Sequence, residues 1–366
     1  MARGPTVAYV LLRNSVFGPN GAASVELCVR DLIRHSRYAG STLVMCPKVD
    51  EPFAGVAINT VPNVAFGGNL AKAWAVGKLL KRRGVDIAIV ENHLPAAAFV
   101  AASSGLPVIL HSHAYEKAPS GAMKRAERDF LLKRLAGFAF VSEDCLARFR
   151  SHYPNARQPM RAIPNGLEMA DWSSAGAKDK SILSVGRGLD DKGHREAMGA
   201  IARALTTRPG WSAHFILSAA DREPETLRAL RADAERTGGR VRIELSLPYA
   251  EVKAAWEKAA VGMALTKTPE PFGRTALEAL ASGAALITSG LGGLAEVCGD
   301  CALRVDPSDA NGLAAVLGGL IDAPERRADL AREGRKRVEA LFDIRTVARQ
   351  MDDFIEACVG EGRKRA

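Results

Sequence analysis

The feature that most constrains the fold of this chain is a regular alternation of short apolar runs with amphipathic stretches along its whole length. In the first half the apolar runs are VAYVLL (7–12), STLVMCP (41–47), DIAIVE (86–91), PVILHS (107–112) and GFAFVS (137–142). The second half continues with KSILSVGR, SAHFILSAA, VRIELS, VGMALTK, AALITS and ALRVDP. Strands that alternate with helices of about 10–15 residues predict parallel sheets joined by right-handed crossovers. We therefore expect an α/β protein made of two Rossmann-like, doubly wound domains.

The domain boundary is expected within IPNGLEMADWSSAGAKDKS (163–181), which is rich in turn-forming residues and has no apolar periodicity. A chain of 366 residues is long enough for about two domains. We assign residues 1–168 to the first domain and 169–342 to the second.

The basic charge of the chain is concentrated in its first half. Residues 1–172 hold 21 Lys and Arg against 13 Asp and Glu, a surplus of 21 − 13 = 8 out of a total of +9. Such asymmetry suggests an anionic partner, either nucleic acid or a lipid headgroup surface. The surplus lies on amphipathic segments such as KRAERDFLLKRLAG and AWAVGKLLKRRG, without basic strands interleaved with aromatic residues. These segments are interpreted either as solvated helix faces or as a surface that meets anionic lipid headgroups, and a membrane surface is favoured over nucleic acid.

The sequence gives no sign of export. We find no signal peptide, and no run approaches the roughly 20 apolar residues that span a bilayer. Six cysteines are scattered along the chain, and only Cys298 and Cys301 have C-x-x-C spacing, which we interpret as two small loop residues. We therefore expect a cytoplasmic protein.

In parallel sheets, ligands bind beyond the carboxyl ends of the strands. After the first strand, GPNGAAS places Gly21 in a loop before a helix, where the backbone can approach a ligand. Two further strand ends carry His93 and the pair His111 and His113. These imidazoles are candidate hydrogen-bond donors or bases. A zinc site would need a third ligand, and the sequence spacing suggests none.

The second half carries two groups suited to a phosphorylated sugar. Arg187 and Lys192 follow its first strand in a glycine-bearing loop, where they suit a diphosphate. Further on, EPFGRTALEALASG places Glu270 before a tight turn and Glu278 inside the following helix. The backbone N–H groups at the start of that helix form a potential anion site. One carboxylate could hold sugar hydroxyls and the other a ribose.

This last stretch strongly resembles the E-x7-E signature of the retaining glycosyltransferases of family 4, which have the GT-B fold. Other segments match that family in order along nearly the whole chain. They are LHSH (110–113), FVSE (140–143), IPNGLE (163–168), SVGRGLDDKG (184–193), GLGGLAEV (290–297) and FDIRTVARQMDDFIEAC (342–358). The last of these looks like a helix that returns to the first domain, so 343–366 would belong there.

The resemblance implies roles for the matched residues. Arg187 and Lys192 would bind the donor diphosphate, Glu278 the ribose and Glu270 the transferred sugar. Backbone amides of Phe272, Gly273 and Thr275 would contact sugar and phosphate. The Gly21 loop would close over the diphosphate, and His113 would contact the donor sugar or the acceptor. Arg274 stands where many relatives have a small or apolar residue, and its guanidinium could add a donor contact. His93 and His111 complete the candidate acceptor side.

The resemblance also implies an activity. It points to metal-independent transfer, with retention, from a nucleotide-diphosphate sugar, with UDP slightly favoured over GDP. The acceptor would be a glycan or a lipid-linked sugar in bacterial-type surface polysaccharide or lipopolysaccharide assembly, at the inner face of the membrane. Glu270 would then position the sugar. The two domains would face a shared cleft and close about the 163–181 hinge. The alternatives are a nucleotide-sugar epimerase on the same fold and, more distantly, a nucleic-acid-binding protein.

Overall fold

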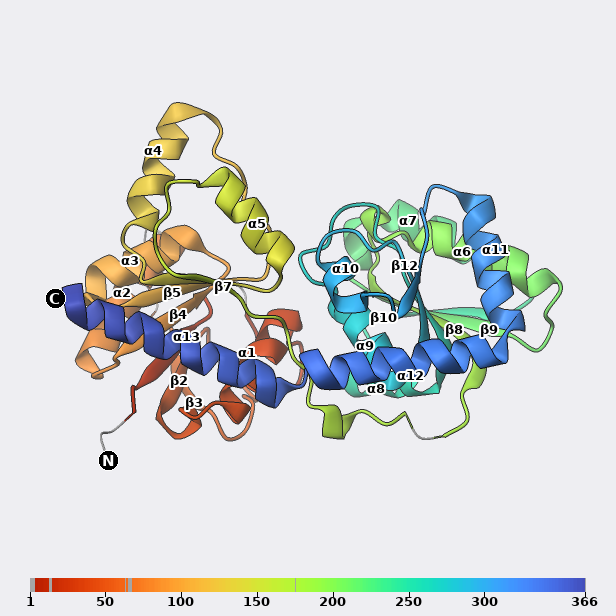
Figure 1. Cartoon of the computed structure of the whole chain (residues 1–366), viewed down its shortest axis with the longest axis horizontal. Coiled ribbons are helices and arrows are strands. Elements are labelled where there is room, and N and C mark those ends of the chain that lie inside the picture. The colour runs from red at the N-terminus through yellow and green to blue at the C-terminus, as the bar shows by residue number, and fades with distance from the viewer. Residues whose placement is uncertain (1–3, 13–14, 63, 65–67, 175, 366) are drawn as a thin grey trace. The chain divides into compact units, whose positions relative to one another are not determined.

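The computed structural model describes residues 4–12, 15–62, 64, 68–174 and 176–365, and it divides into two compact units (Figure 1). Unit 1 comprises Met1–Leu167 together with Ile344–Ala366, and unit 2 comprises Glu168–Asp343. Each unit contains one parallel sheet with helices packed against it. The predicted fold class, two Rossmann-like α/β sheets, is confirmed.

The sheet of unit 1 has the strand order β3-β2-β1-β4-β5-β6-β7, and all its pairings are parallel. The strands are β1 (Val7–Val10), β2 (Thr42–Cys46), β3 (Ala57–Thr60), β4 (Ile87–Glu91), β5 (Val108–Ser112), β6 (Gly137–Phe140) and β7 (Met160–Ala162). The helices are α1 (Ser24–His35), α2 (Gly68–Arg82), α3 (Leu94–Ser104), α4 (Gly121–Leu132), α5 (Glu143–His152) and α13 (Ile344–Arg365). The order reverses between β1 and β4, and ligands bind at such switch points in open α/β sheets.

Strands β3 and β7 were not predicted. Both lie at an edge of the sheet, and neither has a long apolar run: β3 reads AINT and β7 reads MRA. The central strands β1 and β4 are buried along their whole length, so they read as continuous apolar runs.

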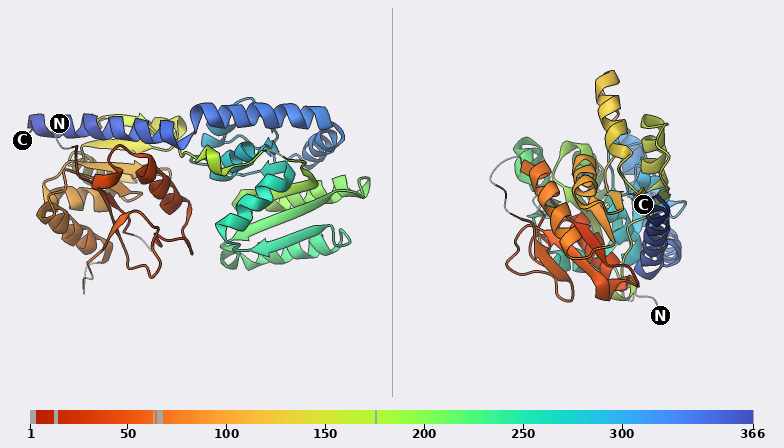
Figure 2. Two further views of the ribbon diagram at one scale, coloured as in Figure 1. Left: turned by 90° about the horizontal axis from the view of Figure 1, so that it is seen from below. Right: turned by 90° about the vertical axis from the view of Figure 1, so that its left-hand side faces the viewer.

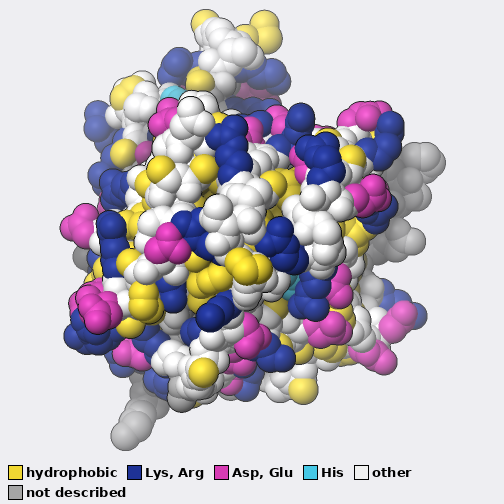
Figure 3. Space-filling view, turned by 90° about the vertical axis from the view of Figure 1, so that its right-hand side faces the viewer, with side chains coloured by type: hydrophobic (Ala, Val, Ile, Leu, Met, Phe, Trp, Pro, Cys, Tyr) yellow, Lys and Arg dark blue, Asp and Glu magenta, His cyan; other side chains and the backbone are white. Residues whose placement is uncertain are grey.

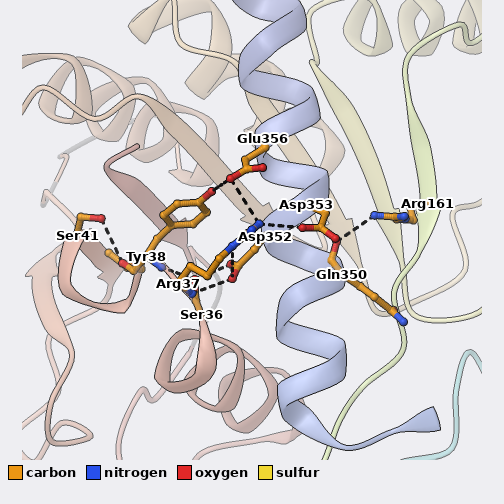
Figure 4. A network of polar contacts seen from close by, with 10 residues as sticks. Ser36, Arg37, Tyr38, Ser41, Arg161, Gln350, Asp352, Asp353 and Glu356 are labelled. Carbon is orange, nitrogen blue, oxygen red and sulfur yellow. Dashed lines mark hydrogen bonds and ion pairs between the residues drawn. The ribbon is translucent and has the colours of Figure 1, made fainter. Parts of the chain in front are cut away.

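The C-terminal helix α13 belongs to unit 1, where it packs against α1 (Figures 1 and 2). Its Asp352 carboxylate accepts a hydrogen bond of 2.6 Å from the Ser36 hydroxyl and another of 2.8 Å from the Arg37 backbone N–H. The Tyr38 hydroxyl donates to Glu356 one turn further along (Figure 4). These bonds fasten α13 to the end of α1.

The sheet of unit 2 has the order β10-β9-β8-β11-β12-β13 and is also entirely parallel. The strands are β8 (Asp179–Arg187), β9 (Ser212–Ser218), β10 (Val241–Leu245), β11 (Ala259–Ala264), β12 (Ala285–Thr288) and β13 (Ala302–Arg304). The helices are α6 (His194–Thr206), α7 (Pro224–Glu235), α8 (Tyr249–Lys258), α9 (Arg274–Ser282), α10 (Gly293–Cys298), α11 (Ala310–Asp322) and α12 (Pro324–Leu341).

The second half of the sequence has nearly equal numbers of basic and acidic residues. Residues 173–366 hold 50 − 21 = 29 basic and 41 − 13 = 28 acidic residues. Figure 3 shows basic and acidic side chains interspersed on the face that it views. None of the helices in the described ranges combines the length and the apolar content needed to cross a bilayer.

Candidate active site

In unit 2, the loop after β8 is held in one conformation by a buried imidazole. The His194 Nε2 lies 3.0 Å from the Arg187 carbonyl oxygen, which can only accept, so Nε2 carries the proton. Its Nδ1 then accepts from the Ser184 hydroxyl at 3.0 Å. Burial lowers the pKa of His194 to about 4, so the ring is neutral near pH 7. His194 thereby fixes the backbone that carries Arg187.

The same loop is tied to the residues that follow β11. Lys267 donates from its backbone N–H to the Asp191 carbonyl at 2.8 Å and from Nζ to the Asp190 carboxylate at 2.6 Å. Gly193 has φ +67°, and a Cβ there would lie 1.7 Å from the Leu265 carbonyl oxygen. Only glycine fits this position, which brings the loop against the end of β11.

The predicted diphosphate ligands differ in their surroundings. The Arg187 side chain is 48% exposed and lies 3.8 Å from Asp191, so its guanidinium is accessible. The Lys192 side chain is 15% exposed, and its ammonium contacts the Glu270 carboxylate. The structure therefore brings together two predicted residues that are 78 positions apart in the sequence.

Glu270 is held by its backbone beside the start of α10. It forms a β-bridge with Gly292, in which the Glu270 N–H donates to Leu291 at 3.1 Å and its carbonyl accepts from Gly293 at 2.7 Å. A Cβ at Gly293 would lie 2.3 Å from the carbonyl oxygen of Pro271. The glycine pair at 292–293 therefore allows the Glu270 loop to lie against α10.

Helix α9 begins directly after the Pro-Phe-Gly turn, with Gly273 as its N-cap at φ +101°. The first backbone N–H groups of an α-helix have no intrahelical acceptor, and in α9 these are the N–H groups around Gly273 and Thr275. Two such groups at a helix start can bind an anion. The Phe272 side chain is buried, with its ring 5.9 Å from that of Phe342, so the backbone of Phe272 is the part that a ligand could use.

Glu278 lies in a buried network. Its Oε1 accepts hydrogen bonds from Arg274 Nε at 2.9 Å and from the Tyr249 hydroxyl at 3.0 Å. The Arg274 and Glu278 side chains are 8% and 4% exposed. Burial raises the pKa of Glu278, although Arg274 and its hydrogen bonds act in the opposite direction.

This network includes Arg274, which the sequence suggested as an added donor contact. In the structure, its guanidinium serves as the partner of Glu278 and also bonds the Tyr249 hydroxyl at 3.1 Å. Sequence reasoning did not identify Tyr249. Tyr249 begins α8 and is not part of any recognisable sequence motif. It lies 29 positions before Glu278 in the sequence, so the sequence did not indicate their contact.

In unit 1, the glycine loop lies between β1 and α1. Gly21 has φ +95°, which favours glycine. A Cβ at the neighbouring Gly18 would lie 2.1 Å from the Glu51 carbonyl oxygen. Gly18 is therefore explained by packing alone, whereas Gly21, whose nearest neighbour would lie at 3.6 Å, has more open surroundings.

The three candidate histidines separate into two groups. His93 caps α3, its Nδ1 accepting from the Ala96 N–H at 3.0 Å. His111 and His113 instead converge on Glu91, the last residue of β4. His111 Nδ1 lies 3.2 Å, and His113 Nε2 3.0 Å, from the same carboxylate oxygen.

Glu91 was not among the predicted site residues. Burial alone would raise the pKa of Glu91, but the two imidazoles outweigh it and lower the pKa to about 2. The three side chains also place one ligand atom each within 4.8 Å of one another, so a third potential metal ligand exists that the sequence spacing did not suggest.

The C-x-x-C pair has no sign of thiolate chemistry. Cys298 is fully buried, and burial raises its pKa to about 12. All the cysteines are free thiols in the structure. These properties fit a structural thiol at the end of α10.

With this geometry established, the chain can be compared with known proteins. The family model "Glycosyltransferase Family 4" matches residues 25–171, and "Glycosyl transferases group 1" matches residues 171–337. Glycogen synthase of Mycobacterium tuberculosis is 28% identical over 337 residues, covering 82% of this chain and 80% of the relative. A GDP-mannose-dependent phosphatidylinositol monomannoside mannosyltransferase of Corynebacterium glutamicum is 25% identical, covering 78% and 80%. Among solved structures, Anabaena HepE with UDP and glucose has a TM-score of 0.74 at 18% identity, covering 97% of this chain and 100% of that one.

Proposed function

The chain belongs to the family 4 retaining glycosyltransferases, which use nucleotide-sugar donors, and from this premise we propose its substrates and the roles of its residues. The proposed reaction moves a hexose from a nucleotide-diphosphate sugar to a glycan or a lipid-linked acceptor. Its biological setting would be the assembly of a bacterial cell-surface polysaccharide in the cytoplasm or at the inner membrane face. Family membership favours transfer over epimerisation of the donor.

The observation that carries this proposal is the contact of Lys192 with Glu270 beside the start of α9. It joins a cation suited to a diphosphate with a carboxylate suited to sugar hydroxyls. The backbone N–H groups of Gly273 and Thr275 lie at the start of α9, a few residues after Glu270. Phosphate and sugar groups that are joined in one donor need neighbouring subsites of this kind.

We assign the residues of unit 2 the following roles. Arg187 and Lys192 neutralise the charge that builds on the leaving diphosphate, which stabilises the transition state. Glu270 positions the transferred sugar, and Glu278 holds the ribose. The acceptor attacks from the face that the diphosphate leaves, and a diphosphate oxygen takes the acceptor proton. No metal is required in this scheme.

In unit 1, Gly21 is assigned a backbone contact with the diphosphate and His113 a contact with the donor sugar or the acceptor. Its exposed, basic surface also suggests where a membrane-bound acceptor is met. The base of the donor is less constrained. The HepE complex contains UDP, which supports a UDP-sugar, whereas the Corynebacterium relative is GDP-mannose-dependent.

A thermal-shift screen against UDP, GDP, ADP, CMP and TDP, each with EDTA and with Mg²⁺, tests the donor assignment. A ligand at 100 times its dissociation constant stabilises the protein by about 2.7 kcal/mol. We expect one nucleotide diphosphate to raise the melting temperature by a few degrees equally in EDTA and in Mg²⁺. Lys192→Met should abolish this shift, and Lys180→Met, an exposed lysine at the start of β8, should preserve it. A shift that survives Lys192→Met would contradict the proposed diphosphate site.

Helix α4 is the proposed membrane contact of unit 1. It projects from the rest of the unit (Figures 1 and 2), and its buried residues are only Leu131 and Leu132. Met123 and Phe130 are 85% and 58% exposed. The segment also carries Lys124, Arg125, Arg128, Lys133 and Arg134. Each cation near an anionic bilayer contributes about 1 kcal/mol, and apolar side chains add to it by insertion.

Co-sedimentation with vesicles of phosphatidylglycerol and phosphatidylcholine tests this contact. We expect binding at low salt that weakens at high salt and is lost in the double variant Met123→Ser, Phe130→Ser. The control is Leu341→Ser, which removes an exposed apolar side chain of unit 2. Equal binding by all three proteins would exclude α4 as the contact.

A further inference from the structure

Lys267 lies between the two segments that carry the proposed donor residues of unit 2. Arg187 ends β8 and Lys192 lies in the loop that follows it, whereas Lys267 and Glu270 both lie in the loop after β11. Strands β8 and β11 are parallel neighbours in the sheet, so the two loops leave it at the same edge. Lys267 precedes the E-x7-E segment and is therefore outside the motif that indicated the site.

The main chain of Lys267 fixes the loop after β8 immediately before Lys192. The Lys267 N–H donates to the Asp191 carbonyl oxygen at 2.8 Å, and Asp191 is the residue that precedes Lys192. Within the loop, the Lys192 N–H donates to the Leu189 carbonyl oxygen at 3.1 Å. The position of Lys192 therefore depends on a contact that Lys267 makes.

The side chain of Lys267 joins this loop to the helix that follows it. Its Nζ donates to the Asp190 carboxylate at 2.6 Å and to Glu196, in the first turn of α6, at 3.2 Å. Among the described residues, no other cation forms an ion pair with either carboxylate. One oxygen of Glu196 is buried and has no hydrogen-bond partner in the described part of the chain. Lys267 is therefore the cation that balances both carboxylates.

These carboxylates lie beside a site that is proposed to bind an anion. The loop after β8 carries Asp190 and Asp191, whose charges would repel a donor diphosphate. Arg187 lies 3.8 Å from Asp191 and balances it. Without the charge of Lys267, Asp190 and Glu196 would be uncompensated at the same edge of the sheet. Two unit charges about 10 Å apart at a protein surface change a binding constant by of order tenfold.

We propose that Lys267 is a positioning residue of the donor site, which holds the loop after β8 in place and neutralises Asp190 and Glu196. The loop can then accept a diphosphate. The inference rests on the proposed role of Arg187 and Lys192 as diphosphate ligands. Lys267 acts through the loop and through its charge, without touching the donor.

The exposure of the ion pair separates this role from a structural one. The Lys267 and Asp190 side chains are 32% and 50% exposed. Ion pairs at this exposure contribute little to the free energy of unfolding, because water screens them. Loss of the Lys267 charge should therefore leave the stability of unit 2 nearly unchanged and weaken the binding of an anion.

Calorimetric titration of the full chain with UDP and UMP, and with GDP and GMP, tests the charge effect. Each monophosphate keeps the base, the ribose and the first phosphate and lacks the second phosphate. We expect Lys267→Met to raise the dissociation constant of the diphosphate about tenfold and that of the monophosphate much less. The melting temperature of the unliganded protein should change by less than about 2 °C. Lys267→Arg should keep most of the affinity. The control Lys336→Met removes another exposed lysine–carboxylate pair of unit 2 and should change neither constant.

A triple variant tests whether the carboxylates cause the loss. Adding Asp190→Asn and Glu196→Gln to Lys267→Met should recover part of the affinity, because no uncompensated charge then faces the diphosphate. Three results would each overturn the proposal. They are an unchanged dissociation constant of the diphosphate in Lys267→Met, an equal loss for the diphosphate and the monophosphate, and no recovery in the triple variant.

Hydrogen exchange of the unliganded chain tests the loop independently of any donor. Mass spectrometry of peptides that cover residues 187–193 should show faster exchange in Lys267→Met than in the wild type or in Lys336→Met. Equal exchange in all three proteins contradicts the positioning of the loop. A wild type that binds no nucleotide diphosphate refutes the proposed function. A diphosphate that binds the wild type and is lost in Lys192→Met, but not in Lys267→Met, refutes the positioning role alone.

Discussion

Replacing Arg274 by Met should destabilise unit 2 strongly, because it leaves the Glu278 carboxylate buried without its cation. Arg274 and Glu278 are 8% and 4% exposed, and their contact is 2.9 Å. Removing one partner of such a pair typically costs about 3–5 kcal/mol. Unit 2 has 343 − 168 + 1 = 176 residues. For a domain of this size, such a loss lowers the melting temperature by roughly 10 °C.

The stability lost in Arg274→Met should become smaller as the pH falls. Burial raises the pKa of Glu278 above its unfolded value, and removing Arg274 raises it further. Between the unfolded and folded pKa values, the folded protein binds a proton that the unfolded chain does not. Stability therefore increases as the pH falls through that window. The difference between the variant and the wild type should be smaller at pH 5 than at pH 7.

Tryptophan fluorescence allows unit 2 to be followed by itself. Of the four tryptophans, only Trp74 lies in unit 1. In a Trp74→Phe background, urea unfolding reports unit 2 alone. The control Arg332→Met removes an exposed pair on α12, which should cost at most about 1 kcal/mol. The reasoning is refuted if Arg274→Met costs less than this control, or if adding Glu278→Gln does not recover part of the loss.

Three further outcomes follow from the geometry. Gly293→Ala should weaken nucleotide binding in the thermal-shift assay, because the added Cβ would lie 2.3 Å from the Pro271 carbonyl oxygen. In the control Gly199→Ala, the added Cβ meets open space on α6, so this variant should stabilise the protein by up to about 1 kcal/mol. Asp352→Ala should lower the free energy of unfolding in urea by about 1–3 kcal/mol, because it leaves the Ser36 and Arg37 donors without their acceptor. The control Asp353→Ala removes a carboxylate that is 57% exposed and should lower it by less than about 1 kcal/mol. The pKa of Glu91 is lowered from 4.5 to about 2, so this residue should contribute stability that is lost as the pH falls through that range. Acid unfolding followed by circular dichroism should show this loss in the wild type but not in Glu91→Gln.

The sheets could be predicted from the sequence because their central strands are buried on both faces. Such strands consist of consecutive apolar residues, and the runs stand out between polar helices. The missed strand β3, AINT, is partly exposed at a sheet edge, where burial does not dictate the residue type. The positions of edge strands therefore depend on pairing with their neighbours, which a single sequence does not encode locally.

The candidate site was predictable where one segment carries the whole pattern. Glu270 and Glu278 share a helix start, so their spacing alone indicated a ligand site. Contacts that depend on register were not visible: Glu91 meets His111 across two strands, and Tyr249 meets Glu278 across two helices. The available signal for Glu91 was a carboxylate that ends the otherwise apolar strand IAIVE (87–91).

Lys192 connects the proposed diphosphate site with the proposed sugar site. In the structure, its ammonium contacts Glu270, so the pair is locally neutral. In the proposed scheme, a donor diphosphate would bring negative charge to the start of α9, and Arg187 and the helix N–H groups would add to the attraction. Lys192 would then be shared between the phosphate and Glu270, and the carboxylate would gain freedom to accept from sugar hydroxyls. Donor binding and orientation of the sugar would therefore be coupled through Lys192. Lys192→Met should impair both, whereas Arg187→Met should lower donor binding and kcat without changing the orientation of the sugar.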